Sequence, residues 1–286
     1  MQNYLVKVLN RAGLLRKINT VTTVDINGAT MRIPLLNGMG YGNMRVSEIW
    51  MCQLLNKIIP GRNGCFIDVG VNLGQTLLKL RSVAPSMDYI GFEPNPKCTY
   101  YCNALIEANQ FKNCRLLPVG LFDKDTVLAL NLYSEGGTDP AASVIDNFRP
   151  EQKVYQKLYV PVSRFEQMYG LLGITSIAII KIDVEGAEME VLESMRPAIT
   201  RHRPVLLMEI LPCHTPDNIF RISRQEKIEL MFKELDYQII RIIKKNNGES
   251  IERLEPIETI GVHSNMELCE YVLVPKEMRN EALSWI

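Results

Sequence analysis

Short apolar segments of this chain end in acidic residues, and a segment with helical periodicity follows each of them. The four clearest segments, with their acids, are 65–69 with Asp68, 89–92 with Glu93, 177–182 with Asp183 and 205–208 with Glu209. Strands that are buried on both faces read as continuous apolar runs, and their alternation with helices is typical of parallel sheets. The pattern therefore predicts an α/β fold, with a mostly parallel sheet and helices on both faces.

The acids at the strand ends indicate where a ligand would bind. In open α/β sheets, ligands bind beyond the carboxyl ends of the strands. Asp68, Glu93, Asp183 and Glu209 should therefore surround one cleft. Such a cleft suits cationic or hydroxyl-bearing groups.

The composition restricts the class of protein. The chain has 286 residues, 32 basic and 32 acidic, and is 47% hydrophobic, which is ordinary for a globular enzyme and too apolar for a disordered chain. Its formal net charge of zero argues against a nucleic-acid partner held by a broad basic face. No segment reaches the roughly 18 apolar residues of a membrane-spanning helix. Seven scattered cysteines favour reduced thiols and a cytoplasmic protein.

Residues 1–45 are interpreted as an N-terminal addition to a main domain of residues 46–286. The addition should contain an amphipathic helix and then a hairpin around Asn27-Gly28. The helix carries basic residues and no acid, so it could lie on an anionic membrane or pack on the main domain or a partner subunit. Packing is favoured because four positive charges make a modest patch for membrane binding. The addition is thus a candidate contact for a homo-oligomer.

The first motif is Phe-Ile-Asp-Val-Gly-Val-Asn-Leu-Gly at residues 66–74. Gly70 and Gly74 permit a tight turn that lets a ligand approach the backbone. The spacing is not the dinucleotide fingerprint, which argues against a nicotinamide oxidoreductase. Asp68 would repel a pyrophosphate and suits a cationic sulfonium or amino group, while Glu93 can accept hydrogen bonds from two ribose hydroxyls. Together they favour a nucleoside cofactor such as S-adenosylmethionine.

The second motif is Lys-Ile-Asp-Val-Glu-Gly-Ala-Glu-Met-Glu-Val-Leu at residues 181–192. Acids in the first turn of a helix are favoured by the helix dipole, which is a sufficient explanation for Glu190 and Glu193. Asp183 ends a strand beside the nucleotide loop, so we expect its side chain to face the cleft.

These segments resemble the FkbM family of S-adenosylmethionine-dependent methyltransferases. The resemblance covers roughly residues 47–211 and is carried by the motifs at 68–74, 92–95 and 180–188, of which the last is the most distinctive. It implies a Rossmann-like fold of seven strands, the last one antiparallel, and O-methylation of a sugar, glycan or natural product. It also implies a set of cofactor-binding residues: Asp68, Gly70, Asn72, Gly74, Glu93, Asn95, Gly120 and Leu121.

The chemistry of hydroxyl methylation requires a base or a metal-bound alkoxide. The candidate catalytic residues are Asp183, Glu185, Glu209 and His214. Asp183 and Glu209 would orient the acceptor or hold a divalent cation, for which oxygen ligands favour Mg²⁺. The long segment 133–157 is expected to cover the acceptor, with Ser143 and its neighbours shaping specificity.

Two alternatives to O-methylation stay open. The fold could serve N-methylation of another acceptor, although the segment after Asp183 lacks the Pro-Pro-aromatic pattern of enzymes that methylate nucleic-acid bases. It could also belong to a cofactor-binding module that has lost turnover.

Overall fold

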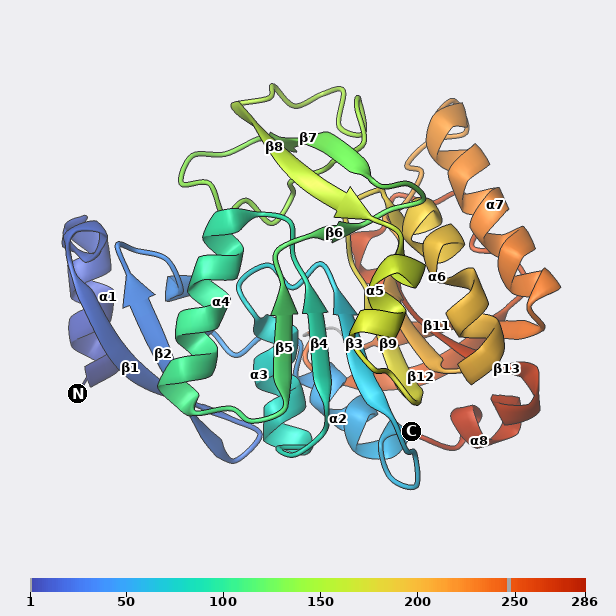
Figure 1. The fold of residues 1–286 in the computed structure, drawn as a ribbon, viewed down its shortest axis with the longest axis horizontal. Coiled ribbons are helices and arrows are strands. Elements are labelled where there is room, and N and C mark those ends of the chain that lie inside the picture. Colours follow the sequence, from blue (N-terminus) through green and yellow to red (C-terminus); the bar gives the residue numbers. More distant parts are fainter. Residues whose placement is uncertain (1, 246–247) are drawn as a thin grey trace.

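The fold is built around one eight-stranded sheet (Figure 1). The computed structural model describes residues 2–245 and 248–286. The strands, in their order across the sheet, are β12 (Ile251–Ile257), β11 (Tyr237–Lys244), β13 (Glu270–Pro275), β10 (Val205–Glu209), β9 (Ile177–Ile182), β3 (Cys65–Val69), β4 (Tyr89–Phe92) and β5 (Cys114–Leu117). The five strands from β10 to β5 are parallel, and β13 runs antiparallel between β10 and β11.

The predicted α/β class and the antiparallel last strand are confirmed, but the main sheet has eight strands where seven were expected. The additional strand, β12, pairs antiparallel with β11 at the edge of the sheet. Its sequence mixes charged residues with apolar ones and contains Pro256, a composition that is typical of edge strands and differs from a buried apolar run.

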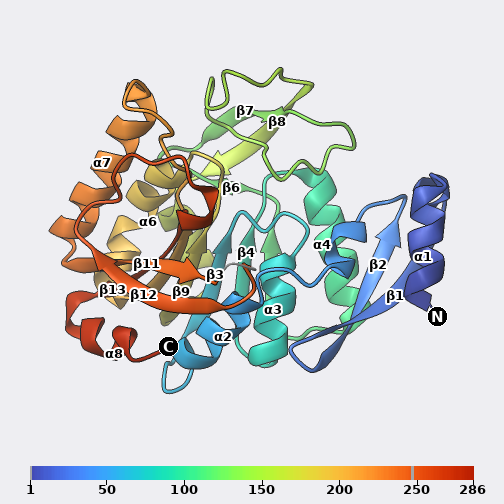
Figure 2. The ribbon, with the colours of Figure 1, turned by 180° about the vertical axis from the view of Figure 1, so that it is seen from behind.

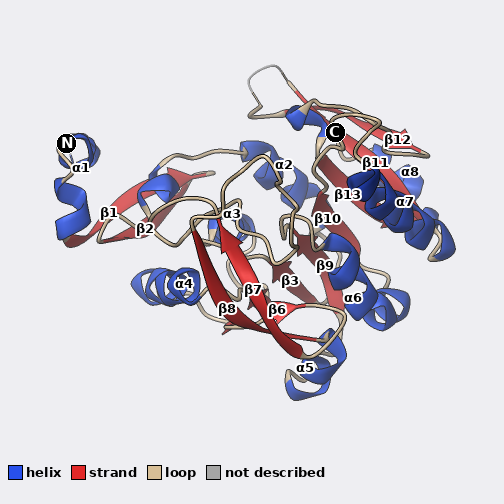
Figure 3. Cartoon of the chain, turned by 90° about the horizontal axis from the view of Figure 1, so that it is seen from above, coloured by secondary structure: helices blue, strands red, loops and turns tan. Residues whose placement is uncertain are grey.

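Helices cover both faces of the sheet, as Figure 3 shows from above. The first face packs on α2 (Ile49–Ile58), α3 (Gln75–Val83), α4 (Pro96–Asn109) and the short α8 (Arg279–Leu283), and the second on α5 (Phe165–Leu171), α6 (Glu188–His202) and α7 (Ile219–Glu234). Alternate residues of β3 point into the two cores, Phe66 into the first and Ile67 into the second, as the two-residue period of a strand requires.

The start of α7 differs from the sequence prediction. A capping box at residues 223–226 predicts that the helix begins there, but α7 begins at Ile219 and Asn218 is its N-cap. The Asn218 side chain accepts a hydrogen bond from the Arg221 backbone N–H at 3.2 Å, so this earlier cap satisfies a free N–H group of the first turn.

A smaller sheet lies over the carboxyl edge of the main one (Figure 1). It consists of β6 (Gly120–Leu121), β8 (Gln156–Ser163) and β7 (Thr126–Leu132), with β8 in the middle. Residues 133–155, which we call the cover segment, connect β7 to β8 and form most of the loop above the strand ends. The expected long connection therefore lies where a ligand at the carboxyl edge would be enclosed.

The N-terminal residues pack beside α4, as Figures 1 and 2 both show. They form α1 (Gln2–Arg11), η1 (Leu14–Lys17), the β1 (Asn19–Ile26) and β2 (Ala29–Leu36) hairpin, and η2 (Tyr41–Met44). The predicted hairpin is confirmed: Asn27 and Gly28 have φ of 52° and 79°, the positive values that a two-residue hairpin turn requires. Asn109 of α4 accepts from the Arg32 N–H and donates to the Arg32 carbonyl, both at 2.7 Å.

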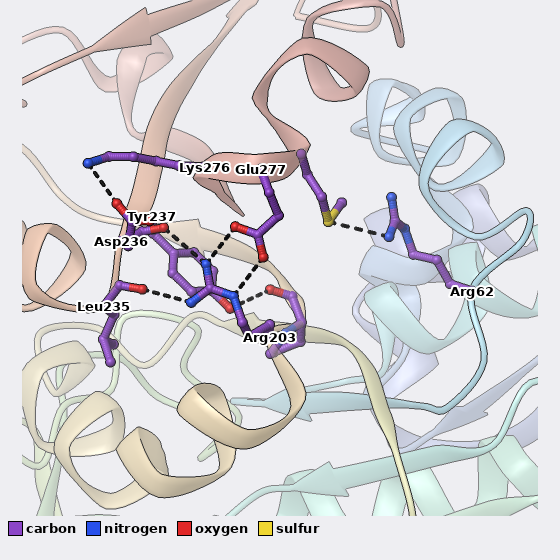
Figure 4. Close-up of polar contacts among 9 residues, drawn as sticks. Arg62, Arg203, Leu235, Asp236, Tyr237, Lys276 and Glu277 are labelled. Atoms are coloured by element: carbon purple, nitrogen blue, oxygen red, sulfur yellow. Dashed lines mark hydrogen bonds and ion pairs between the residues drawn. The ribbon is translucent and has the colours of Figure 1, made fainter.

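Arginine contacts fix the edge opposite the site (Figure 4). Arg203, the C-cap of α6, donates to both carboxylate oxygens of Glu277 in η4 (Lys276–Met278) at 2.8 and 2.7 Å. It also donates to the Leu235 carbonyl at 2.9 Å and lies over the Tyr237 ring.

A short η3 (Met266–Leu268) precedes β13. Among the described helices, none is long and apolar enough to cross a membrane.

Candidate functional site

A cavity of about 320 Å³ lies at the carboxyl edge of the main sheet, beneath the cover segment. Its size falls within the range of small-molecule sites. Nine of the twelve predicted site residues line it: Gly70, Asn72, Glu93, Asn95, Gly120, Leu121, Asp183, Glu185 and Glu209. The structure thus brings together the strand-end acids Glu93, Asp183 and Glu209, although the strands that carry them are far apart in the sequence.

The loop between β3 and α3 forms the floor at one end of the cavity. Gly70 has φ of 89°, and a Cβ there would lie 1.9 Å from the Asp183 carbonyl oxygen. The loop passes directly against the end of β9, so this position requires glycine. The Asn72 side chain accepts a hydrogen bond from the Leu73 N–H at 2.7 Å, which stabilises its own left-handed backbone.

Glu93 at the end of β4 is the acid best arranged to hold a sugar. Its Oε2 accepts the Asn72 N–H at 2.7 Å and its Oε1 accepts the Asn95 N–H at 2.8 Å. Burial raises the pKa of Glu93 to about 7, against the lowering effect of these two hydrogen bonds. A carboxylate oxygen has more than one acceptor site, so each oxygen can also accept a ribose hydroxyl.

Small and apolar residues form another part of the cavity wall. Gly120 and Leu121 of β6 line it together with Val162 of β8 and Cys98 of α4. A Cβ at Gly120 would meet Val162 at 3.1 Å, so the small residue keeps the strand close to its neighbour. Apolar walls of this kind could hold a purine ring.

Three predicted residues do not line the cavity. Asp68 is fully buried, and its Oδ2 accepts a hydrogen bond from the Tyr89 hydroxyl at 2.7 Å; it supports the strand end behind the loop. Gly74 is the N-cap of α3, and a Cβ on it would lie 2.8 Å from the Leu105 side chain. His214 is exposed, in the loop after β10, where its N–H donates to the His263 carbonyl at 2.9 Å.

A cluster of carboxylates forms a further part of the cavity wall. One oxygen from each of Asp183, Glu185 and Glu209 lies within 4.8 Å of the others. Three carboxylates this close repel each other unless protons or cations neutralise them. Such a set of oxygens can ligate a divalent cation.

Lys181 supplies part of the neutralising charge. It is 8% exposed, and its ammonium lies 2.9 Å from Asp183 Oδ2. Burial alone would raise the pKa of Asp183, but Lys181 and a hydrogen bond from Glu209 hold it below its usual value. Burial and the charge of Asp183 raise the pKa of Glu209 well above its usual value. Glu209 is therefore the protonated partner, and Asp183 is the ionised one.

Three further acids that line the cavity were not predicted as site residues from the sequence: Glu270, Glu48 and, in the cover segment, Asp139. Glu270 stands opposite Glu209 at the start of β13, and Glu48 precedes α2. The antiparallel course of β13 explains the first, because such a strand begins at the edge where its parallel neighbours end. The predicted antiparallel last strand was a signal that could have identified Glu270; Glu48 has no comparable signal in the sequence.

Comparison with known proteins assigns the chain to a family. Residues 68–239 match the methyltransferase FkbM domain, which is more than half of the chain. The protein therefore belongs to the FkbM methyltransferase family, as the resemblance of its motifs implied.

The individual relatives have low sequence identity with this chain. "Methyltransferase 1" of Beauveria bassiana is 29% identical over 143 residues, which span 45% of this chain and 57% of that protein. The chain thus covers less than two thirds of that relative. Solved structures with similarity include an FkbM methyltransferase of Methylobacillus flagellatus (14% identity, TM-score 0.44, covering 74% of this chain and 43% of the other). Another is precorrin-6y C5,15-methyltransferase of Geobacter metallireducens, with 10% identity and a TM-score of 0.36; the match covers 79% of this chain and 87% of the other.

Proposed function

We propose that this protein is an S-adenosylmethionine-dependent O-methyltransferase whose acceptor is a hydroxyl of a sugar, glycan or natural product. One observation carries the proposal: a single cavity is lined both by the buried strand-end acid Glu93 and by the carboxylate cluster of Asp183, Glu185 and Glu209. A cofactor that joins a nucleoside to a cationic sulfonium matches both features.

The lining residues fit this cofactor. Glu93 would hold the ribose, Gly120 and Leu121 the adenine, and the backbone at Gly70 and Asn72 the methionine portion. Asn95 would act indirectly, because its amide already donates to the Gly137 carbonyl at 2.8 Å and accepts from the Lys97 N–H at 3.0 Å. When bound, the cofactor supplies an electrophilic methyl group, and the chain supplies alignment and a route for the acceptor proton.

The acceptor would meet an acidic surface. Hydroxyl groups can donate hydrogen bonds to carboxylates, whereas a phosphorylated acceptor would be repelled, so we propose a neutral polyhydroxyl acceptor. Asp183 or Glu185 would take the proton, and the protonated Glu209 would orient the acceptor. Glu185 suits proton transfer at neutral pH because burial raises its pKa to about 7. His214 does not line the cavity, so it would not share this role.

The cover segment would enclose the acceptor. Ala142 and Val144 line the cavity, together with Asp139 and Pro140. Ser143 between them is fully buried, and its hydroxyl accepts the Ile145 N–H at 3.1 Å. We therefore propose that the neighbours of Ser143, and not Ser143 itself, contact the acceptor and determine specificity. Ser143 would stabilise the conformation of the cover segment through its hydrogen bond with Ile145.

Mg²⁺ at Asp183 and Glu209 is the alternative way to neutralise the cluster. In this alternative the cation would compete with the Lys181 ammonium for Asp183. Assaying transfer with and without a chelator decides between the two, because full activity in chelator excludes a required metal.

The proposal is tested first by cofactor binding and then by transfer. Calorimetry should detect binding of S-adenosylmethionine and S-adenosylhomocysteine and none of NAD. The protein is then incubated with methyl-labelled cofactor and panels of neutral oligosaccharides, sugar phosphates and amines, with D183N as the control for turnover. Transfer to a neutral hydroxyl supports the proposal; transfer only to amines indicates N-methylation. Binding without any transfer indicates a non-catalytic module.

Two further predictions belong with this function. We propose a cytoplasmic enzyme, in keeping with its seven free cysteines. Self-association through residues 1–45 is tested by light scattering on the full chain and on a variant in which exposed Leu14 is replaced by Glu.

A further inference from the structure

The turn that carries Glu185 is held by contacts from several elements. Glu185 and Gly186 connect β9 to α6 with φ of 52° and 105°. The Gly186 N–H donates to Glu188 at 2.8 Å, and the Gly186 carbonyl accepts from Arg224 of α7 at 2.8 Å. These hydrogen bonds fix the backbone of the turn, but they do not involve the Glu185 side chain, so its orientation depends on a different contact.

The cover segment provides that contact through Arg149. The Arg149 guanidinium forms an ion pair with Glu185, and the two side chains are 15% and 16% exposed. The pair is therefore largely shielded from water, where an ion pair with a hydrogen bond is stronger than at the surface. Glu185 belongs to the carboxylate cluster, so Arg149 brings a second cation to it besides Lys181.

Phe148, the residue before Arg149, fixes the same end of the segment. A Cβ on Gly186 would lie 2.5 Å from the Phe148 ring, so the ring fits against the bare glycine. The guanidinium of Arg221, in α7, stacks over the ring, with its Cζ 4.2 Å from the ring centroid, and donates to the Phe148 carbonyl at 2.9 Å. Phe148 is 5% exposed and Arg221 7%, so this end of the segment is packed into the protein.

The other end of the cover segment is attached separately, above the cofactor end of the cavity. Asn95 donates to the Gly137 carbonyl at 2.8 Å, and Lys97 donates to the Gly136 carbonyl at 3.1 Å. The two attachments share no residue, so one can open while the other stays closed.

We propose that Arg149 is a positioning residue, which orients Glu185 for the reaction and closes the acceptor half of the cover segment onto it. Glu185 is then correctly held only when this half is closed. The positioning role rests on the proposed function, whereas the closing contact does not. With the segment open, Glu185 would face Asp183 and Glu209 without its cation, which disfavours the open state.

Hydrogen exchange on the full chain tests the contact without any acceptor. In R149Q, amides of residues 144–152 and 185–188 should exchange roughly tenfold faster, which corresponds to a loss of about 1.4 kcal/mol in the free energy of local opening. Exchange at residues 133–139 should change little. E185Q should give the same pattern, and it replaces R149Q as the test if R149Q does not fold. R149K keeps the charge and should restore most of the protection. The matched control is R164Q, which removes the exposed ion pair with Asp125 near the end of β8.

The outcomes separate this inference from the proposed function. Unchanged exchange at 144–152 in both R149Q and E185Q, or equal loosening of both halves, overturns the closing contact. With a neutral polyol acceptor, R149Q should lower kcat at least tenfold, leave the KM for S-adenosylmethionine within about threefold, and be rescued by R149K. A normal kcat in R149Q overturns the positioning role. A wild-type protein that transfers no methyl group contradicts the proposed function and leaves the exchange result to be judged independently.

Discussion

Glu209 and Glu270 stand directly opposite each other on the antiparallel strands β10 and β13, at the edge of the cavity. Like charges in directly opposite positions destabilise a sheet. Burial, followed by the charges of Glu48 and Asp183, raises the pKa of Glu270 to about 8. The pair is therefore a place where the fold holds protons that the unfolded chain releases.

The first prediction is that E270Q is more stable than the wild type at pH 8. In the unfolded chain Glu270 loses its proton near the ordinary glutamate pKa of 4.5, whereas in the folded protein it keeps the proton up to about pH 8. Between these values the native state binds more protons, so its contribution to stability falls as the pH rises. We expect E270Q to gain roughly 1–3 kcal/mol at pH 8 and almost nothing near pH 4.5, measured by urea unfolding. E258Q at an exposed position is the control, and an equal gain in E258Q contradicts the explanation.

The second prediction concerns the ion pair of Lys181 and Asp183. K181M leaves the Asp183 carboxylate beside Glu185 and Glu209 without its cation, so the free energy of unfolding should fall by about 2–4 kcal/mol. The double variant K181M/D183N removes both charges and should recover most of that loss in urea unfolding.

An exposed lysine gives the matched control for K181M. K157M, in β8, should stay within about 0.5 kcal/mol of the wild type. If K181M/D183N is as unstable as K181M, the loss comes from packing of the Lys181 side chain and not from the unpaired carboxylate.

Elements that bury apolar residues on both faces could be predicted from the sequence, because their pattern does not depend on their neighbours. The strand ends at Asp68, Glu93, Asp183 and Glu209 belong to this group. β12 could not be distinguished in the same way, because an edge strand lies partly in solvent and its charged residues look like those of a loop.

The contacts that complete the site depend on how the chain returns to it. Glu270 reaches the cavity because β13 inserts between β10 and β11, and Arg149 reaches Glu185 from a loop 36 residues earlier. No local sequence pattern predicts either the position of Glu270 at the cavity or the contact of Arg149 with Glu185. His214 is the opposite case. It follows Glu209 closely in the sequence, but its side chain is exposed on the loop after β10 and does not reach the cavity.

The third prediction is that E93Q weakens cofactor binding. An amide at this position can accept only one of the two N–H bonds from Asn72 and Asn95, and its NH₂ group would face a donor. We expect the Kd for S-adenosylhomocysteine to rise roughly 10- to 100-fold, measured by calorimetry. E107Q on the exposed side of α4 is the control. An unchanged Kd in E93Q would mean that the ribose lies elsewhere.

The last prediction separates backbone strain from steric overlap at Gly70, in the loop between β3 and α3. Gly70 and Gly28 have similar positive φ, 89° and 79°, but an added Cβ overlaps the Asp183 carbonyl at Gly70 and meets nothing within 4 Å at Gly28. G28A should therefore cost only the left-handed strain, about 1–2 kcal/mol. G70A must in addition push the loop away from β9, so it should lose roughly 3 kcal/mol or more and bind no S-adenosylhomocysteine. Thermal unfolding and calorimetry on both variants measure this, and equal losses in stability would show that the loop does not depend on its close approach to Asp183.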